Sequence, residues 1–144
     1  MVNITVPVNY LAVVGAAVVS MIIGSLWYGP LFGKLWMKEM GMGKQKMNDA
    51  MKNGMAKTYG LMFLGSLVMS FVLAHATIFA ASYFKIEGVT AGLMSGFWNW
   101  LGFVAPVTLG SFLWEGKSFK LWLMNNGYYL MTLLAMGTVV SVWK

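Results

Sequence analysis

Residues 27–36 read WYGPLFGKLW, and this stretch decides the fold that we expect for the chain. It closes the first long apolar run and opens a long polar segment. Aromatic side chains gather where a chain leaves a bilayer, and proline breaks or kinks a helix. We therefore interpret the stretch as an interfacial motif with seven members: Trp27, Tyr28, Gly29, Pro30, Phe32, Gly33 and Trp36.

The composition is typical of a membrane protein. Of the 144 residues, 59% are hydrophobic and 10% are charged, whereas a soluble domain carries about 25% charged residues. The absence of cysteine excludes disulfides, thiolate metal sites and cysteine catalysis. The ten basic residues are all lysine and collect beside apolar runs, so we expect no nucleic-acid partner despite the net charge of +6.

Four apolar runs are each long enough to cross a hydrocarbon core of ~30 Å. They lie at residues 9–28, 59–84, 88–114 and 121–143. Pro30 is expected to stop the first helix, and Pro106 is expected to kink the third. No lysine precedes the first run and no small-residue cleavage site follows it, so we expect this run to be retained rather than removed as a signal peptide.

The polar segment between the first two runs holds six lysines over residues 34–57. After Gly41 and Gly43, apolar residues recur at helical spacing, namely Met47, Ala50, Met51, Gly54 and Met55. This pattern predicts a short amphipathic helix in the headgroup layer. The expected fold class is therefore all-α: a single domain over residues 1–144, an integral membrane four-helix bundle with a short amphipathic interfacial helix between helices 1 and 2.

The lysines also predict an orientation. With four spans, residues 34–57 and 115–120 lie on one side and together carry eight lysines, whereas the other side carries Lys85 and Lys144. The positive-inside rule places the lysine-rich side in the cytoplasm. We therefore expect a multi-pass protein with both termini on the non-cytoplasmic side of the membrane.

Several motifs together resemble those of a known family. They are Asn9-Tyr10-Leu11-Ala12, residues 24–36, Gly92 with Gly96, Trp100-Leu101-Gly102-Phe103 and residues 125–130. Over almost its whole length the chain resembles the uncharacterised bacterial membrane-protein family known as domain of unknown function seventeen sixty-one. The resemblance implies a four-helix protein of the bacterial cytoplasmic (inner) membrane, and it implies no activity.

Two polar residues are expected at similar depth in neighbouring helices. His75 lies about nine residues from the outer end of its run and Asn99 about eleven from the same end of the next, and a three-residue turn joins the two runs. A hydrogen bond between them could hold the helices together. An intramembrane histidine can instead mark a proton or ligand site, but no acid lies in a span, and we favour the structural interpretation.

The fourth run carries a polar face. Asn125, Tyr129 and Thr132 share it at helical spacing, and Asn126 lies beside them. An unpaired amide in hydrocarbon is costly, so these groups must meet protein or water. We favour an interhelical hydrogen-bond seam over a polar vestibule or pore lining. In the third run, Gly88, Gly92 and Gly96 form overlapping GxxxG repeats, which predict a helix-packing face.

Two binding hypotheses remain weaker. Fourteen methionines, including Met40 and Met42, suggest Cu(I), yet no neighbouring histidine or cysteine assists them. Trp98 and Trp100 flank Asn99 near the expected midplane, where a quinone or pigment could stack. We expect no metal site, no cofactor and no catalytic residues, because no nucleophile–base pair or phosphate loop is present.

The sequence thus predicts a non-enzymatic structural or accessory subunit in the lipid bilayer. It would self-associate as a homo-oligomer or join a larger membrane complex, with the glycine face available for contact beyond one bundle. One alternative is a small oligomeric channel or transporter with a polar path on the fourth helix. Another is a binder of a hydrophobic ligand near Trp98 and Trp100. An enzyme acting on lipids is disfavoured by the missing catalytic set.

Overall fold

The computed structural model describes residues 5–144, and the fold over these residues is all-α, as predicted. Helix α1 (Tyr10–Leu26) continues through a π-helical turn, η1 (Trp27–Leu31). Helices α2 (Gly33–Glu39) and α3 (Lys44–Lys52) follow, and then the long α4 (Met55–Phe84). Helix α5 (Gly88–Asn99) continues through a second π turn, η2 (Trp100–Val104), into α6 (Ala105–Leu113), and α7 (Phe119–Val142) ends the chain.

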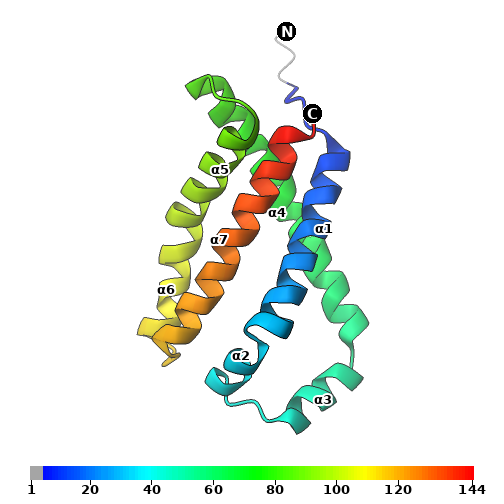
Figure 1. Cartoon of the computed structure of the whole chain (residues 1–144), viewed down its shortest axis with the longest axis vertical. Helices are drawn as coiled ribbons and strands as arrows, with labels where there is room; N and C mark the ends of the chain where they lie inside the picture. Colours follow the sequence, from blue (N-terminus) through cyan, green and yellow to red (C-terminus); the bar gives the residue numbers. More distant parts are fainter. Residues whose placement is uncertain (1–4) are drawn as a thin grey trace.

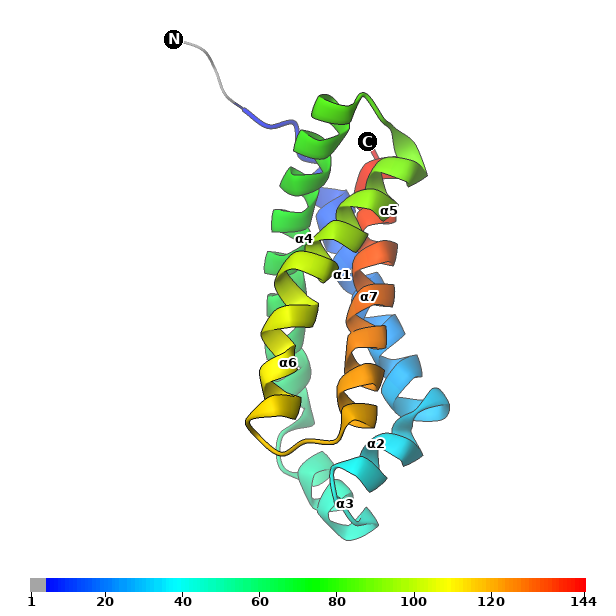
Figure 2. The same cartoon turned by 90° about the vertical axis from the view of Figure 1, so that its left-hand side faces the viewer.

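Four rods run antiparallel in the order α1, α4, α5–α6 and α7 (Figure 1). One end of the bundle, the terminal end, holds the start of α1, the turn between α4 and α5, and the C-terminus (Figures 1 and 2). The other, the lysine-rich end, holds α2, α3 and the turn between α6 and α7. The sequence places eight lysines and three acids at the lysine-rich end, a net charge of +5, and two lysines and one acid at the terminal end.

Helix α7 is the central rod, and it packs against α1, α4 and α5. A core cluster of Ala16, Leu73, Leu133 and Met136 lies where the rods meet. The seam between α1 and α4 is made of small residues, so their backbones approach closely. Here the Ser20 hydroxyl donates to Ser66 Oγ at 2.8 Å, and the Ser70 hydroxyl donates to the Val13 carbonyl at 2.6 Å. The seam therefore contains its own buried polar pairs.

Within the described residues, two helices are long and apolar enough to cross a membrane: Tyr10–Leu31 and Met55–Phe84, each with a mean hydropathy of 2.0. The third rod is divided into three shorter stretches by its π turn. The fourth rod carries Asn125 and Asn126, which lower its hydropathy. The other two predicted spans thus form helices, α5–α6 and α7, but do not meet the same criterion.

The first helix ends close to Pro30, as expected, but the proline lies inside its last turn and not after it. Proline cannot donate a backbone hydrogen bond, and the helix widens into the π turn η1, which contains Pro30. The Phe32 amide donates to the Trp27 carbonyl at 2.8 Å and closes this turn. The helix therefore continues to Leu31, and a second, unanticipated helix, α2, begins two residues later.

The predicted amphipathic helix is present as α3 but is shorter than expected. Gly54 has φ of +136°, a conformation that breaks the helix after Lys52. Gly54 and Met55 therefore do not belong to α3, and Met55 begins α4 four residues before the predicted span. We call residues 33–54, which carry α2 and α3, the arch.

Pro106 lies at the start of α6, directly after the π turn η2. Pro106 has no backbone N–H to donate, and the wider π turn accommodates the missing hydrogen bond. The Thr108 hydroxyl donates to the Val104 carbonyl at 2.8 Å and so satisfies one carbonyl of the turn. The neighbouring helix α7 contacts the same threonine, as described below. The sequence predicted a disturbance at this point but not its π-helical form.

Candidate functional site

The expected hydrogen bond between His75 and Asn99 is not formed. His75 Nδ1 lies 2.8 Å from the Phe71 carbonyl oxygen, and the Asn99 amide donates to the Ser95 carbonyl at 2.8 Å. Each side chain is thus bonded to its own helix, one turn back. The buried face of α4 includes Ala74 and Thr77, and a helix turns by about 100° per residue, so His75 lies off that face. His75 and Asn99 lie at a similar depth along their helices, but their side chains do not face each other.

His75 instead lies in an aromatic row on the outer side of α4. Its ring centroid is 4.5 Å from that of Phe71 and 6.3 Å from that of Phe79. Both phenylalanines are exposed, and His75 is half-buried between them. Nε2 makes no hydrogen bond within residues 5–144. One polar atom is therefore left on an otherwise apolar surface.

The two neighbouring asparagines of α7 form hydrogen bonds to different rods. Asn126 is 2% exposed, and its amide donates to Thr108 Oγ1 at 3.0 Å and to the Trp122 carbonyl at 3.1 Å. The main-chain carbonyl of Asn126 accepts a hydrogen bond from Trp100 Nε1 at 3.1 Å. Asn126 thereby ties α7 to η2 and α6.

Asn125 lies on another side of α7 and accepts a hydrogen bond from the Tyr28 hydroxyl at 2.8 Å, which ties α7 to η1. Farther along α7, Thr132 is 1% exposed, and Tyr129 is half-buried beside a cavity. The two asparagines therefore form an interhelical hydrogen-bond seam inside one chain. The buried Thr132 hydroxyl has no hydrogen-bond partner within residues 5–144.

The glycine face of α5 is also occupied within the chain. A Cβ atom on Gly96 would lie 2.5 Å from the Leu133 carbonyl oxygen, and one on Gly92 would meet the Gly137 carbonyl and, at 2.6 Å, Ser141 Oγ. This face therefore packs against α7 and offers no contact beyond the bundle. Gly88 does not share this packing: it has φ of +60° and open space around it, and serves the turn that begins α5.

Trp98 and Trp100 do not form a joint site for a quinone or pigment. Trp98 is 59% exposed, on the outside of α5. Trp100 packs against the core cluster and donates to Asn126. Two positions along a helix differ by about 200°, so the two rings face in different directions.

The interfacial motif packs largely on itself and on α7. The Trp27 ring lies 4.7 Å from Phe32 and 6.4 Å from Tyr128, and the Tyr28 ring lies 5.1 Å from Tyr128 and 6.1 Å from Trp36, all between centroids. Gly33 is buried, and a Cβ on it would lie 2.6 Å from the Tyr28 carbonyl oxygen, whereas Gly29 has open space. The motif thus positions the start of the arch against α7.

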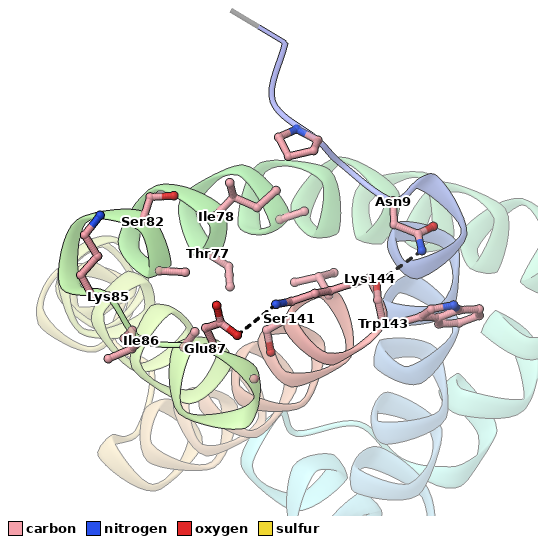
Figure 3. Close-up of a pocket in the computed structure, with 16 residues that line it drawn as sticks. Asn9, Thr77, Ile78, Ser82, Lys85, Ile86, Glu87, Ser141, Trp143 and Lys144 are labelled. Atoms are coloured by element: carbon pink, nitrogen blue, oxygen red, sulfur yellow. Dashed lines mark hydrogen bonds and ion pairs between the residues drawn. The ribbon is translucent and has the colours of Figure 1, made fainter.

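Two cavities are found at opposite ends of the bundle. The terminal pocket, about 670 Å³, lies at the terminal end between α4, α5 and α7 (Figure 3). Lys144 Nζ lies 3.4 Å from Glu87 Oε2 beside this pocket, and the Asn9 amide donates to the Trp143 carbonyl at 3.4 Å. Thr77 points into it; this side chain is 2% exposed, and its hydroxyl has no partner within residues 5–144.

The methionine pocket, about 680 Å³, lies at the lysine-rich end between η1, the arch, α4 and α7. Aromatic and small residues share its lining with six methionines: Met21, Met37, Met47, Met51, Met55 and Met62. Lys34 is the one charged residue that lines it. The sequence showed Met47, Met51 and Met55 on one side of a helix but did not reveal the opposite wall, which includes Tyr128 and Tyr129 of α7.

The structure offers no further support for a metal centre. Among residues 5–144, no group of three or more histidine, cysteine, aspartate or glutamate side chains is placed to hold a metal ion. Of the methionines considered for Cu(I), Met40 and Met42 do not line the methionine pocket. The hypothesis of a copper site therefore stays a prediction that the sequence alone disfavours.

Comparison with known proteins identifies the family but not an activity. The family model described as Protein of unknown function (DUF1761) matches residues 11–141, and the chain belongs to this family. No curated protein matches the chain. No solved structure matches it either.

Proposed function

We propose that the chain is a four-span protein of the bacterial inner membrane with a non-enzymatic, accessory role, and that it self-associates through the outer faces of α4 and α5. The outward apolar side chains support membrane insertion. Large exposed hydrophobic residues follow all four rods, for example Val18, Ile22, Leu64, Val68, Val72, Leu93, Phe103, Val107, Leu123 and Met131. Such a surface is far larger than soluble monomers expose, and lipid would cover it.

The observation that carries the self-association is His75. A polar atom on a lipid-facing surface at mid-membrane depth is unfavourable unless a partner satisfies it. Nδ1 lies 2.8 Å from the Phe71 carbonyl oxygen, and we therefore assign the tautomer in which Nδ1 donates and Nε2 is an acceptor. Two such acceptors cannot bond to each other. The partner helix must therefore supply a donor.

A second copy of the chain offers such a donor in Trp98. Both His75 and Trp98 lie ten residues from the turn centred on residues 85–88, so they have similar depth on adjacent rods. The Trp98 side chain is 59% exposed, and indole Nε1 is a donor only. A two-fold arrangement then pairs His75 of each copy with Trp98 of the other. This replaces the glycine face as the proposed contact between copies.

The polar face of α7 no longer favours an oligomeric channel. Asn125 and Asn126 bond within the chain, and α7 packs against three other rods. The proposed orientation keeps the lysine-rich end in the cytoplasm and both termini outside it, by the positive-inside rule.

Single cysteines test the topology, because the chain has none of its own. We expect Lys144→Cys to react with a membrane-impermeant maleimide in intact spheroplasts. Lys44→Cys, on the arch, should react only after lysis. Labelling of both without lysis, or recovery of the protein in the soluble fraction, would contradict the proposed topology.

A second set of variants tests the association. Phe79→Cys, one turn from His75, should give disulfide-linked dimers in membranes, whereas Phe103→Cys, on the outside of η2, should give few. His75→Phe and Trp98→Phe, added singly to Phe79→Cys, should each lower the dimer fraction severalfold. Trp114→Phe is the matched control, because Trp114 is 87% exposed and lies near the rod end. Equal dimer fractions in all variants would rule out this interface.

A further inference from the structure

The methionine pocket has the size and chemistry of a ligand site. Its volume of about 680 Å³ lies within the ~300–1,000 Å³ of small-molecule sites, which are lined mainly by apolar side chains with a few polar groups. Methionine is flexible and polarisable, so six of them form a wall that adapts to an apolar chain. The lining thus favours an aliphatic ligand over a polar one.

The charge around the pocket favours a negatively charged ligand. Lys34 is exposed at the pocket, and no carboxylate lies within 4.0 Å of its ammonium group among residues 5–144. No acid lines the pocket. On the same arch, Glu39 accepts a short hydrogen bond from Ser118. With a net charge of +5 at this end of the chain, the pocket is complementary to an anionic headgroup.

One wall of the pocket is attached through glycine hinges. Met47, Ala50 and Met51 of α3 form this wall. Helix α3 lies between Gly41, with φ of +64°, and Gly54, with φ of +136°, and it packs on the first part of α4. The wall is therefore a short, peripheral helix that is not part of the four rods.

We infer that the methionine pocket binds an anionic phospholipid, with an acyl chain among the methionines and the phosphate at Lys34. Basic pockets between membrane-spanning helices on the cytoplasmic side recognise such headgroups. The inference rests on the proposed function, because it requires the lysine-rich end to lie in the cytoplasmic headgroup layer.

Photocrosslinking of the full chain tests the inference. The purified protein is mixed with dodecylmaltoside micelles that contain phosphatidylglycerol with a diazirine in its acyl chain, and then irradiated and digested with trypsin. We expect adducts on the peptides 47–52 and 53–57, severalfold above those from phosphatidylcholine with the same acyl chain. Lys34→Gln should lower the adducts about fivefold, which corresponds to one lysine–headgroup contact.

The matched control is Lys120→Gln, which removes the same charge from the same end but does not line the pocket. Its adducts should stay unchanged. Ala50→Trp, on the peripheral α3, should fill the pocket and remove the adducts while the helical content measured by circular dichroism is preserved. Equal labelling by phosphatidylcholine, or an equal loss in Lys34→Gln and Lys120→Gln, would overturn the inference. Micelles impose no orientation, so this result is independent of the maleimide test of topology.

Discussion

The terminal pocket and the methionine pocket have almost the same volume but are built differently. The terminal pocket, about 670 Å³, is enclosed by the ends of bundle helices, with an ion pair and a buried threonine hydroxyl beside it. The methionine pocket, about 680 Å³, needs the arch as its outer wall. The first cavity therefore depends on how tightly the rods pack. The second depends on a short segment outside the rods.

This difference separates changes that damage the bundle from changes that affect the arch alone. The bundle is held by close backbone contact and buried hydrogen bonds, which are sensitive to single atoms. The arch is short and is joined through glycines with positive φ. Four substitutions test the separation.

The largest effect is expected for Gly92→Ala. The added Cβ would meet the Gly137 carbonyl and Ser141 Oγ, so α5 and α7 must move apart, at about 1–3 kcal/mol of the free energy of unfolding. Because Ser141 lines the terminal pocket, that pocket changes with the seam. Gly65→Ala is the control, since Gly65 lies within α4 with open space, and it should stabilise by about 0.5–1 kcal/mol. Unfolding in detergent with increasing SDS measures both, and equal shifts would refute the tight seam.

Asn126→Ala should have the next largest effect. It removes the side-chain amide that donates to the Thr108 hydroxyl and to the Trp122 carbonyl in the buried seam, at about 1–2 kcal/mol. The bond from the Trp100 indole stays, because it goes to the main-chain carbonyl of residue 126. Asn48→Ala, on the exposed side of α3, should leave the SDS midpoint unchanged. A midpoint for Asn126→Ala within error of the parent protein would show that the seam is dispensable.

Gly54→Ala should affect the arch and spare the bundle. A side chain at φ of +136° is strained by about 1–3 kcal/mol, and the hinge relieves this strain by moving α3. We expect faster tryptic cleavage after Lys52, with little change in the SDS midpoint. Gly60→Ala, which has open space and helical φ, is the control. Cooperative loss of the whole bundle in Gly54→Ala would show that arch and rods form one unit.

The smallest effect is expected for Lys144→Gln. Its ion pair with Glu87 joins side chains that are 70% and 82% exposed, and such pairs contribute only about 0–1 kcal/mol at low salt and less at high salt. The SDS midpoint should therefore hardly move, and any shift should vanish in salt. A salt-independent loss larger than that of Asn126→Ala would mean that the ion pair, not the packing, maintains the terminal pocket.

The four rods could be predicted from the sequence because each is a long apolar run bounded by polar or turn residues, whereas the short α2 was not anticipated. The three-residue turn at 85–87 and the helical spacing of methionines in α3 are local signals of this kind. Which face of each rod points inward could not be predicted. Helix α4 is apolar all round, so its pattern carries no stripe that marks the buried side, and the pairing of His75 with Asn99 failed for this reason.

Two further features depend on tertiary structure and left no local signal. The π turn around Pro30 is followed directly by α2, which packs against α7. A proline alone predicts only that the helix ends, not that its last turn widens. The methionine pocket requires Tyr128 and Tyr129 to face Met47 and Met51 across about 80 residues of sequence. The hydrogen bonds of Asn126 could be predicted in part, because an amide in an apolar helix must find a partner. The sequence did not identify Thr108 and Trp100 as the residues that bond to it.

In the proposed membrane-spanning arrangement, the length of α4 has a consequence for the bilayers that would suit the protein. Thirty residues extend for about 45 Å, against a hydrocarbon thickness of ~30 Å. The turn at 85–87 fixes the terminal end tightly, so the surplus of α4 projects at the opposite end and holds the arch above the acyl chains. A thicker membrane would take up this surplus before it reached Lys57. In the proposed orientation, the surplus length of α4 accommodates differences in membrane thickness on the cytoplasmic side. The opposite side of the protein has no surplus helix length.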